Sequence, residues 1–485
     1  MIRQCILSPY RHVPAPSLRF PSRPIRLCHR LSEVRRSIVI DPLRDVSQYQ
    51  EIAAAAGLKI TAVAETHIHA DFVSGARELS ADGKTSVYVS AEGGPDWQSE
   101  WARDLPQTRL LHDGDTFHIG RIQLQAWHTP GHTPEHLSYL ITDQGGGADE
   151  PLGIISGDFL FVGDVGRPDL LEQAAGQAGT QEAGARQLYH SLKKLSALPD
   201  HLQVLPAHGA GSACGKSLGA VPTSTLGYEK RFNHALRLAL NDAEQAFVDF
   251  ILEGQPEPPL YFANMKKVNK TGPAILGPIV PPRAWDLAGV EPRLSSPDFV
   301  VVDSRNDRQA FAGRHLRGSL FAPSRGDFSG FAGSFLDPAQ EVVLVVESAD
   351  QVDGLARQLL RIGFDHVVGW LPAAVLVEAP EGMLSSFPTT TFAGLAALLQ
   401  STAGAVILDV RRSTEHAAGH ARGALNIAHT RLRAREEELP TGVPLVVHCQ
   451  SGMRAATASA WLARRGRRVI HVNDAFPNLP AALLA

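Results

Sequence analysis

The stretch "THIHADF" (66–72) places two histidines and an aspartate at alternate positions, His67, His69 and Asp71. Imidazole and carboxylate groups at this spacing can converge on one metal ion, because both bind metals and lie close together along the chain. Phe72 ends the stretch with a side chain that cannot bind a metal. The stretch therefore predicts a metal centre and leaves open which residues complete it.

A strand–helix–strand pattern leads up to this stretch. "SIVIDP" (37–42) is a β-branched run stopped by Asp-Pro, "YQEIAAAAGLKI" (49–60) is helical until Gly57, and "TAVAETH" (61–67) is again a strand. The pattern places His67 at the carboxyl end of a strand, where α/β folds collect their sites. Further strands are predicted at 86–90, 122–129, 136–141, 152–158 and 202–208.

Three further candidate ligands follow predicted strands in the same way. They are His132 in "TPGHTPEH", Asp158 in "SGDFLF" and His208 in "PAHG". A single histidine is more often a structural residue than a ligand. Several motifs in this order, each near the end of a strand, predict one shared metal site.

The set of motifs resembles the metallo-β-lactamase fold, an αββα sandwich whose metals lie at one edge. The resemblance extends over about residues 38–240. The opening strands of that fold are not recognisable in residues 1–36, so the edge of the first sheet is the part that the sequence leaves undefined.

The dizinc hydrolases of this family, such as glyoxalase II, bind two metals with these motifs. Their first metal takes three histidines, which match His67, His69 and His132. Their second metal takes an aspartate and two histidines, with a bridging aspartate; the matching positions here are Asp71, Phe72, His208 and Asp158. Because Phe72 replaces one of these ligands, the second metal would have too few protein ligands and is disfavoured.

The surrounding sequence is similar to the persulfide dioxygenases, the mono-iron branch of this fold, in the versions fused to rhodanese domains. "GDFLFVGDVGRPDL" (157–170) and "PAHGAGSACGKSLG" (206–219) carry this similarity. The resemblance implies one Fe(II) per chain, with zinc as the other metal to consider, on His67, His132 and Asp158. This is a facial triad of two imidazoles and one carboxylate. The resemblance implies that His69, Asp71 and His208 orient ligands and water around the metal.

Two residues near these motifs have two interpretations each. Arg167 is suited to hold the anionic group of a thiol carrier, and equally to form a structural ion pair with Asp169 or Asp164. Cys214, six residues after His208, either accepts sulfur near the metal or is small buried filler.

A second candidate site lies in "LVVHCQSGMRAATAS" (445–459), which predicts a strand, a short loop and the start of a helix. Backbone N–H groups and the helix N-terminus would stabilise a thiolate or persulfide at Cys449. The alternative is a buried structural cysteine. The loop resembles the active-site loop of rhodaneses, which assigns Cys449 as nucleophile and Arg454 as the closing residue. The loop residues between them are Gln450, Ser451, Gly452 and Met453.

The last 200 residues or so contain two similar halves. "FVVVDSRNDRQAFAGRHLRGSLFAP" (299–323) aligns with "AVILDVRRSTEHAAGHARGALNIAH" (405–429), and both contain Asp-x-Arg and His-x-Arg-Gly. We expect rhodanese-like domains at 281–378 and 390–485, of which the first lacks the cysteine and offers Glu347 or Ser348 in its place. Asp409 and Arg411 are expected to fix the fold rather than act in chemistry.

The domain boundaries follow from these patterns. They are an atypical Arg-rich segment at 1–36, a metallo-β-lactamase-like domain at 37–243 and a packed, Pro-rich and helix-poor linker at 244–280, followed by the two rhodanese-like domains. The Arg-rich segment has the composition of a mitochondrial presequence, and equally that of an unstructured tail or a wrongly assigned start. The expected location is the cytoplasm, with a mitochondrial location left open.

Composition excludes several classes of partner. The net charge of −4 and the absence of a basic stripe argue against nucleic acid, and no apolar run is long enough to cross a bilayer. Four scattered cysteines favour a reducing compartment over a disulfide framework. Assembly into a homo-oligomer stays open.

These resemblances together imply a persulfide dioxygenase that uses O2 to release sulfite, coupled to rhodanese sulfur transfer that forms thiosulfate. The small molecules involved would be a persulfide, O2, sulfite and thiosulfate. Two alternatives remain at this point. One is a dizinc thioester hydrolase like glyoxalase II with an accessory sulfurtransferase domain. The other is a catalytically silent sulfur-carrier or sensing protein.

Overall fold

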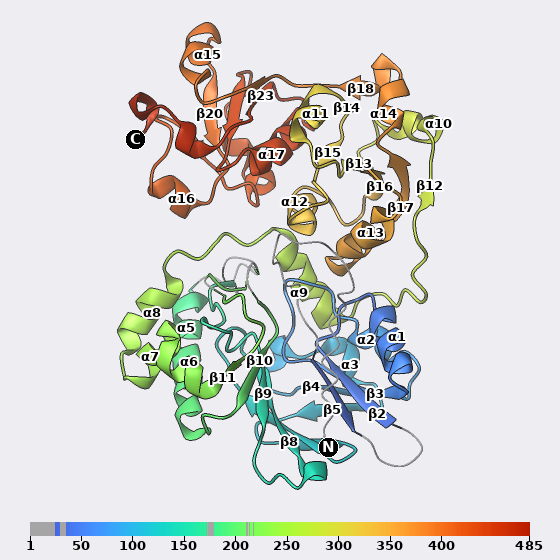
Figure 1. Ribbon diagram of the computed structural model, residues 1–485, viewed down its shortest axis with the longest axis vertical. Coiled ribbons are helices and arrows are strands. Elements are labelled where there is room, and N and C mark those ends of the chain that lie inside the picture. The colour runs from blue at the N-terminus through green and yellow to red at the C-terminus, as the bar shows by residue number, and fades with distance from the viewer. Residues whose placement is uncertain are drawn as a thin grey trace. The chain divides into compact units, whose positions relative to one another are not determined.

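The computed structural model describes residues 25–29, 35–170, 172, 179–209, 212, 214–216 and 218–485. They form two compact units (Figure 1). Unit 1 consists of Met1–Pro258 and Phe262–Ile279, and unit 2 of Pro259–Tyr261 and Val280–Ala485. In the described part of the chain, no helix is both long enough and apolar enough to cross a membrane.

The first sheet of unit 1 has the order β1-β2-β3-β4-β5. Its strands are β1 (Ile25–His29), β2 (Arg35–Ile40), β3 (Leu58–Ala64), β4 (Ser86–Ser90) and β5 (Thr108–Leu111). Strands β2 to β5 are parallel, and β1 pairs antiparallel with β2. Strand β1 lies in the segment where the sequence shows no recognisable opening strand. A short edge strand has only one neighbour and leaves little periodic signal in the sequence.

The second sheet of unit 1 has the order β11-β10-β9-β8-β7-β6. Its strands are β6 (Thr116–Ile119), β7 (Ile122–His128), β8 (Leu137–Asp143), β9 (Gly153–Gly157), β10 (Gln203–Pro206) and β11 (Ser224–Thr225). Strands β9 and β10 are parallel, and the other pairs are antiparallel.

Alternating side chains join the two sheets face to face. Ile38 and Ile40 of β2 enter a core shared with Leu124 of β7, whereas Val39 between them enters a separate core under the helices. A strand sends successive side chains to opposite faces, so one apolar run supplies both cores. This is why "SIVI" is apolar at almost every position.

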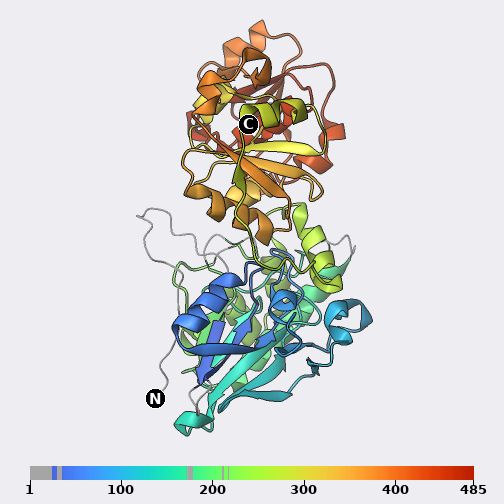
Figure 2. The same ribbon diagram turned by 90° about the vertical axis from the view of Figure 1, so that its right-hand side faces the viewer.

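Helices cover the outer face of each sheet, which makes the αββα sandwich. The first sheet is covered by α1 (Ser47–Ala55), α2 (Ala76–Leu79) and α3 (Glu100–Arg103). The second is covered by α5 (Thr180–Lys193), α6 (Leu226–Phe232), α7 (His234–Leu240) and α8 (Glu244–Leu252). Figure 2 shows the blue strands of the first sheet beside the teal strands of the second. The expected fold of this part of the chain is confirmed.

The stretch 244–280 differs from the expected helix-poor linker. Helix α8 packs on the second sheet, and helix α9 (Tyr261–Thr271) follows within the Pro-rich part. Contacts place 244–258 and 262–279 with unit 1. Helix α9 buries Phe262, Met265 and Asn269, spaced so that they share one face. The prolines on either side of α9 make this short helical pattern hard to recognise in the sequence.

Unit 2 contains two sheets with the same topology. In the first module the order is β12 (Arg283–Ala284), β17 (Val367–Pro372), β16 (Glu341–Val346), β13 (Phe299–Asp303) and β15 (Leu320–Phe321). In the second it is β19 (Thr389–Thr390), β23 (Val469–Val472), β22 (Leu445–His448), β20 (Val406–Asp409) and β21 (Leu425–Asn426). All pairs in both sheets are parallel. The repeat seen in the sequence is therefore a repeat of one α/β module.

Helices and a small two-stranded sheet complete unit 2. The helices are α10 (Leu287–Val290), α11 (Arg308–Gly313), α12 (Phe328–Gly333), α13 (Gln351–Arg361), α14 (Val375–Glu378), α15 (Leu395–Ser401), α16 (Ser413–Ala417) and α17 (Met453–Arg464). Strand β14 (His315–Leu316) pairs with β18 (Leu384–Ser385). The two modules share one apolar core, in which Phe335 of the first stacks on Trp461 of the second.

Each module contains the same ion pair at the end of the strand next to its central strand, β13 in the first and β20 in the second. Arg411 holds Asp409 with Nε and Nη2, at 3.0 and 2.6 Å, and its Nη2 also donates to the carbonyl of Gly419. Arg305 holds Asp303 in the same way, at 3.0 and 2.7 Å. Both pairs join a strand end to the following helix, which is the structural role expected for Asp-x-Arg.

Candidate functional site

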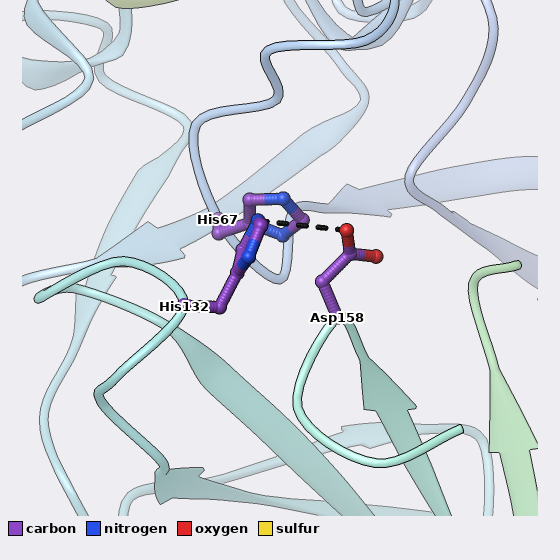
Figure 3. A group of neighbouring side chains, drawn as sticks. All are labelled: His67, His132 and Asp158. Carbon is purple, nitrogen blue, oxygen red and sulfur yellow. Dashed lines mark ion pairs between the residues drawn. The ribbon is translucent and has the colours of Figure 1, made fainter. Parts of the chain in front are cut away.

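His67, His132 and Asp158 come together at one edge of the sandwich in unit 1 (Figure 3). Each follows a strand: His67 follows β3, His132 lies between β7 and β8, and Asp158 follows β9 directly. Their ligand atoms lie within 4.8 Å of one another, and His132 Nε2 is 3.5 Å from Asp158 Oδ2. All three side chains are buried.

The donor atoms of this group fit a metal ion. His67 Nε2 and both carboxylate oxygens of Asp158 are buried without a hydrogen-bond partner among the described residues. Burial lowers the pKa of His67 well below its usual value, which keeps the imidazole neutral and able to bind a metal. Burial alone would raise the pKa of Asp158, but His208 and the other histidines hold it well below its usual range. Two neutral imidazoles and one carboxylate are a set that Fe(II) or zinc accepts.

Thr66 determines which nitrogen of His67 is free. The Thr66 hydroxyl donates its one proton to Asp41 Oδ2 at 2.8 Å. It must then accept from His67 Nδ1, 2.9 Å away. With the proton on Nδ1, the lone pair on Nε2 faces the metal site. Asp41 also accepts from the Thr66 N–H at 2.7 Å, so a single carboxylate fixes both the backbone and the hydroxyl.

The second histidine is oriented by a backbone carbonyl. His132 Nδ1 lies 3.0 Å from the carbonyl oxygen of Arg167, which leaves Nε2 toward Asp158. The Arg167 side chain is 0% exposed and forms a two-point ion pair with Asp169, at 2.9 and 2.6 Å. These contacts favour the second interpretation of Arg167, a structural ion pair with Asp169, because the guanidinium is buried and its charge is matched; a role in holding a thiol carrier stays a prediction.

Gly157 and His136 place Asp158, and neither was among the residues predicted for the site. The Asp158 N–H donates to His136 Nε2 at 3.1 Å. Gly157 has φ +54°, and a Cβ there would lie 2.6 Å from His136 Nε2 and 2.8 Å from Thr66 Oγ1. Only glycine allows this close approach. His136 ends the motif "TPGHTPEH", so its position in the motif was the available signal.

A second group of possible ligands adjoins the first. His208 Nε2 lies 3.2 Å from Asp158 Oδ1 and 3.3 Å from Asp71 Oδ2. The thiol of Cys214 belongs to this group, within 4.8 Å of Asp71 and His208. Burial raises the pKa of Cys214 to about 12, so the metal-free protein keeps it as a thiol. Asp71 and His208 thus border the metal site, and Cys214 is buried beside them.

His69 lies beside the ring of His67, with the ring centroids 4.2 Å apart, but its Nε2 is bonded to carboxylates outside the triad. His69 Nε2 lies 3.1 Å from Glu65 and 3.2 Å from Asp41. Burial alone would lower the pKa of His69, but these two carboxylates raise it well above its usual value. Phe72 is 3% exposed and belongs to the core between the first sheet and its helices, with its ring centroid 4.2 Å from that of His69.

The candidate sulfur loop in unit 2 is formed by the chain between β22 and α17. Cys449 is buried, and its sulfur accepts the Gly452 N–H at 3.1 Å. Gly452 has φ +87°, which a residue with a Cβ rarely adopts, and its carbonyl lies 3.0 Å from His471 Nε2. Helix α17 begins at Met453, so its N-terminus adds positive potential near the sulfur. The side chains of Gln450 and Ser451 are exposed.

Arg454 is held by a carboxylate. Its Nη1 and Nη2 donate to the two oxygens of Glu415 at 2.6 and 2.7 Å. The fork-to-fork geometry orders the guanidinium at the base of the loop. Glu415 lies in the helix that follows Asp409 and was not singled out from the sequence.

In the first module, the side chain of Gln351 fills the corresponding loop. Gln351 Oε1 accepts the N–H groups of Glu347 and Ser348 at 3.1 and 3.3 Å. Asp350, just before α13, has φ −66°, whereas Gly452 just before α17 is left-handed. This loop therefore has neither a sulfur nor free N–H groups at these two positions.

Two family models match the chain. Residues 32–208 match the metallo-beta-lactamase superfamily, and residues 392–479 match the rhodanese-like domain. A solved structure described as a metallo-beta-lactamase from Staphylococcus aureus subsp. aureus COL is 38% identical, with a TM-score of 0.60. That likeness covers 70% of this chain and 92% of the other.

Two of the curated relatives that match part of the chain have different names. Persulfide dioxygenase ETHE1, mitochondrial, of Bos taurus is 27% identical over 214 residues, which is 43% of this chain and 70% of that protein. Hydroxyacylglutathione hydrolase of Tolumonas auensis is 32% identical over 191 residues, 39% of this chain and 63% of that protein. The chain thus spans less than two thirds of the hydrolase.

Proposed function

Because the chain belongs to the metallo-β-lactamase superfamily and carries a C-terminal rhodanese-like domain, we propose that it oxidises a low-molecular-weight persulfide with O2 and transfers sulfur through Cys449. In the first reaction one persulfide, one O2 and one water give one thiol, one sulfite dianion and two protons. In the second, sulfite and a persulfide sulfur give thiosulfate. Glutathione persulfide is the carrier we expect.

The observation that carries this proposal is the combination of a two-histidine, one-carboxylate site with a cysteine loop in one chain. His67, His132 and Asp158 supply three ligand atoms from one side. Position 72, which supplies a second-metal ligand in the dizinc hydrolases, is occupied by a phenylalanine ring in the apolar core. A site with three protein ligands leaves positions for substrate and O2.

The unpartnered atoms of His67 and Asp158, together with the neighbouring imidazole of His132, fit Fe(II), which when bound there would supply the activation of O2. The residues around it have defined tasks. Thr66 and the Arg167 carbonyl keep Nε2 of His67 and His132 unprotonated and aimed at the site. Asp71 and His208 border the site beside Asp158, where they can hold water or the incoming sulfur.

The sulfurtransferase step follows from the loop at Cys449. The thiolate attacks the terminal sulfur of a persulfide, the sulfur–sulfur bond breaks, and the carrier leaves as a thiolate. Backbone N–H groups and the α17 N-terminus stabilise the negative charge of the resulting cysteine persulfide. Sulfite then attacks its outer sulfur, forms thiosulfate and returns Cys449 as a thiolate.

A second candidate is a two-metal thioester hydrolase, which one observation favours. Asp71, His208 and Cys214 form a further group of possible ligands, and Asp158 lies 3.2 Å from His208 on the side facing it. A thiolate from Cys214 could replace the histidine missing at position 72. A metal-bound hydroxide would then attack a thioester carbonyl.

Metal analysis and oxygen uptake distinguish the two candidates. The full chain, purified from its own host and reconstituted anaerobically, should bind one iron and consume one O2 for each sulfite formed from glutathione persulfide. Metal-free protein is the control and should consume none. Two zinc ions per chain, thioester hydrolysis and no oxygen uptake by the iron form would overturn the dioxygenase proposal in favour of the hydrolase.

A further inference from the structure

We propose that helix α9 helps to form the metal centre. Asn269 of this helix is the positioning residue that holds the backbone of the loop carrying His67 and Asp71. The inference rests on the proposed function only in requiring that unit 1 bind a metal. Helix α9 lies in the connector that leads from unit 1 into unit 2 along the chain. Nothing in its sequence resembles a ligand motif, so its role comes from geometry alone.

Asn269 makes three hydrogen bonds to this loop. Its Nδ2 donates to the carbonyl oxygens of His69 and Phe72, at 2.8 and 2.7 Å. Its Oδ1 accepts the Ser74 N–H at 2.8 Å. The side chain is 5% exposed. One amide therefore uses both of its N–H groups and its oxygen on three backbone groups of a single loop.

These bonds matter because the loop has no secondary structure of its own. The chain is irregular from Glu65 to Val73, so its buried backbone groups need partners from elsewhere. The residues bonded through their carbonyls, His69 and Phe72, flank Asp71 on both sides. His69 is also two residues from His67. Asn269 thus fixes the path of the backbone between the first ligand and the residue that borders the metal site.

A second contact connects α9 with the same loop. Glu135 Oε1 accepts the Ile68 N–H at 2.8 Å. Lys266, three residues before Asn269, interacts electrostatically with Glu135 and lies 3.5 Å over the ring of Trp97. The loop is therefore held directly by Asn269, and a second α9 side chain, Lys266, acts electrostatically on the carboxylate that accepts the Ile68 N–H.

The connector is itself fastened to unit 1 beyond the helix. Arg77 Nη1 donates to the carbonyls of Gly272 and Pro273, at 3.2 and 2.8 Å. Glu78 accepts the N–H groups of Leu276 and Gly277, at 2.8 and 2.9 Å. Both residues belong to α2, which follows the metal loop directly. These contacts anchor α9 against the loop, so Asn269 acts from a fixed helix.

Replacing Asn269 by aspartate tests the role with little change in shape. The carboxylate keeps the acceptor for Ser74 but loses both donors and faces two carbonyl oxygens. The readouts are Co(II) affinity by chelator competition, the visible spectrum of bound Co(II), and the thermal midpoint of metal-free protein. We expect about 10- to 100-fold weaker Co(II) binding and a shifted spectrum. Asn264→Asp is the matched control on the same helix, because no described hydrogen bond joins Asn264 to the loop.

Asn269→Gln, which keeps the amide on a longer stem, should recover part of the affinity and serves if Asn269→Asp does not fold. A purely structural role would lower the thermal midpoint of Asn269→Asp and leave affinity and spectrum unchanged, which would overturn the inference. Equal Co(II) binding by the wild type and both Asn269 variants would also overturn it. Wild-type protein that binds Co(II) tightly but oxidises no persulfide in its iron form would refute the proposed function and leave this inference intact.

Discussion

The metal centre of unit 1 is assembled from side chains that follow three different strands, whereas the sulfur loop of unit 2 is one run of consecutive residues. In the metal centre, side chains bind and other side chains orient them, as Thr66 orients His67. In the sulfur loop, the backbone holds the sulfur, and Gly452 supplies both an N–H group and the left-handed turn. The first site is therefore sensitive to distant substitutions, and the second to changes at the cysteine and glycine.

The largest effect expected is that of Cys449→Ser. Removing the nucleophile should lower thiosulfate sulfurtransferase activity by about 10³-fold or more, because no covalent route remains. Oxygen uptake by unit 1 should be unchanged. Ser451→Ala is the control, since that side chain is exposed. Sulfurtransferase activity retained by Cys449→Ser would contradict the assignment of Cys449 as the nucleophile.

Asp158→Ala should impair the metal centre of unit 1 and spare the sulfurtransferase activity of unit 2. Losing the one carboxylate of the triad should weaken metal binding by at least about 10²-fold, more than the loss of a residue that only orients a ligand. Sulfurtransferase activity should persist. Metal content after gel filtration and oxygen uptake are the measurements, with the exposed Asp149→Ala as control. A variant that retained stoichiometric metal would exclude Asp158 from the site.

Acid should destabilise unit 2 in a defined window. Burial lowers the pKa of His315, His448 and His471 to about 4, and that of His429 to about 3. In the unfolded chain these residues take up protons near pH 6.5, so the unfolded state binds more protons as the pH falls from 6.5 to 4. Stability should be complete above this window and decline through it, by about 3 kcal/mol for each histidine at most.

Urea unfolding of unit 2, followed by tryptophan fluorescence and loss of sulfurtransferase activity, measures this loss. His471→Gln should reduce the slope of stability against pH, because one of the four groups is removed. Since no metal is involved, metal-loaded and metal-free protein should give the same slope. A flat profile between pH 6.5 and 4 would contradict the assignment of neutral buried histidines.

Thr66→Val should have the smallest of these effects. The valine is similar in shape but cannot accept the His67 Nδ1 proton, so we expect about 10- to 100-fold weaker metal binding. Thr66→Ser keeps the hydroxyl and should bind metal nearly as wild type. If valine and serine behaved alike, the orientation of His67 would have to come from another group.

The two sites also differ in how far the sequence predicts them. Cys449 to Arg454 is contiguous, so its strand, loop and helix could be placed from the sequence, and residues 392–479 match the rhodanese-like domain. His67, His132 and Asp158 each follow a recognisable strand, but it was the resemblance to persulfide dioxygenases that selected them among the candidate ligands. The apolar runs predict the strands of unit 1, and the resemblance of its motifs to the metallo-β-lactamase fold predicts how they are arranged.

The supporting residues could not be predicted in this way. Asn269 lies 200 residues from His69, and Glu415 lies 39 residues from Arg454. Such partners are brought together by tertiary packing and leave no periodic pattern in the sequence. Arg167 shows the same limit: its type allows both roles, and only its burial shows that its charge is used internally. Strand β1 and helix α9 are short and bounded by prolines or arginines, so their apolar pattern is weak.

Phe72 limits which single substitutions could give this site a further ligand. Its ring is 3% exposed and packs in the core with Val63 and Leu79, beside the ring of His69. A histidine at position 72 would place a polar ring in that apolar core and leave its nitrogens without partners. The substitution Phe72→His would therefore cost stability before it supplied a ligand, and the neighbouring core would have to change with it.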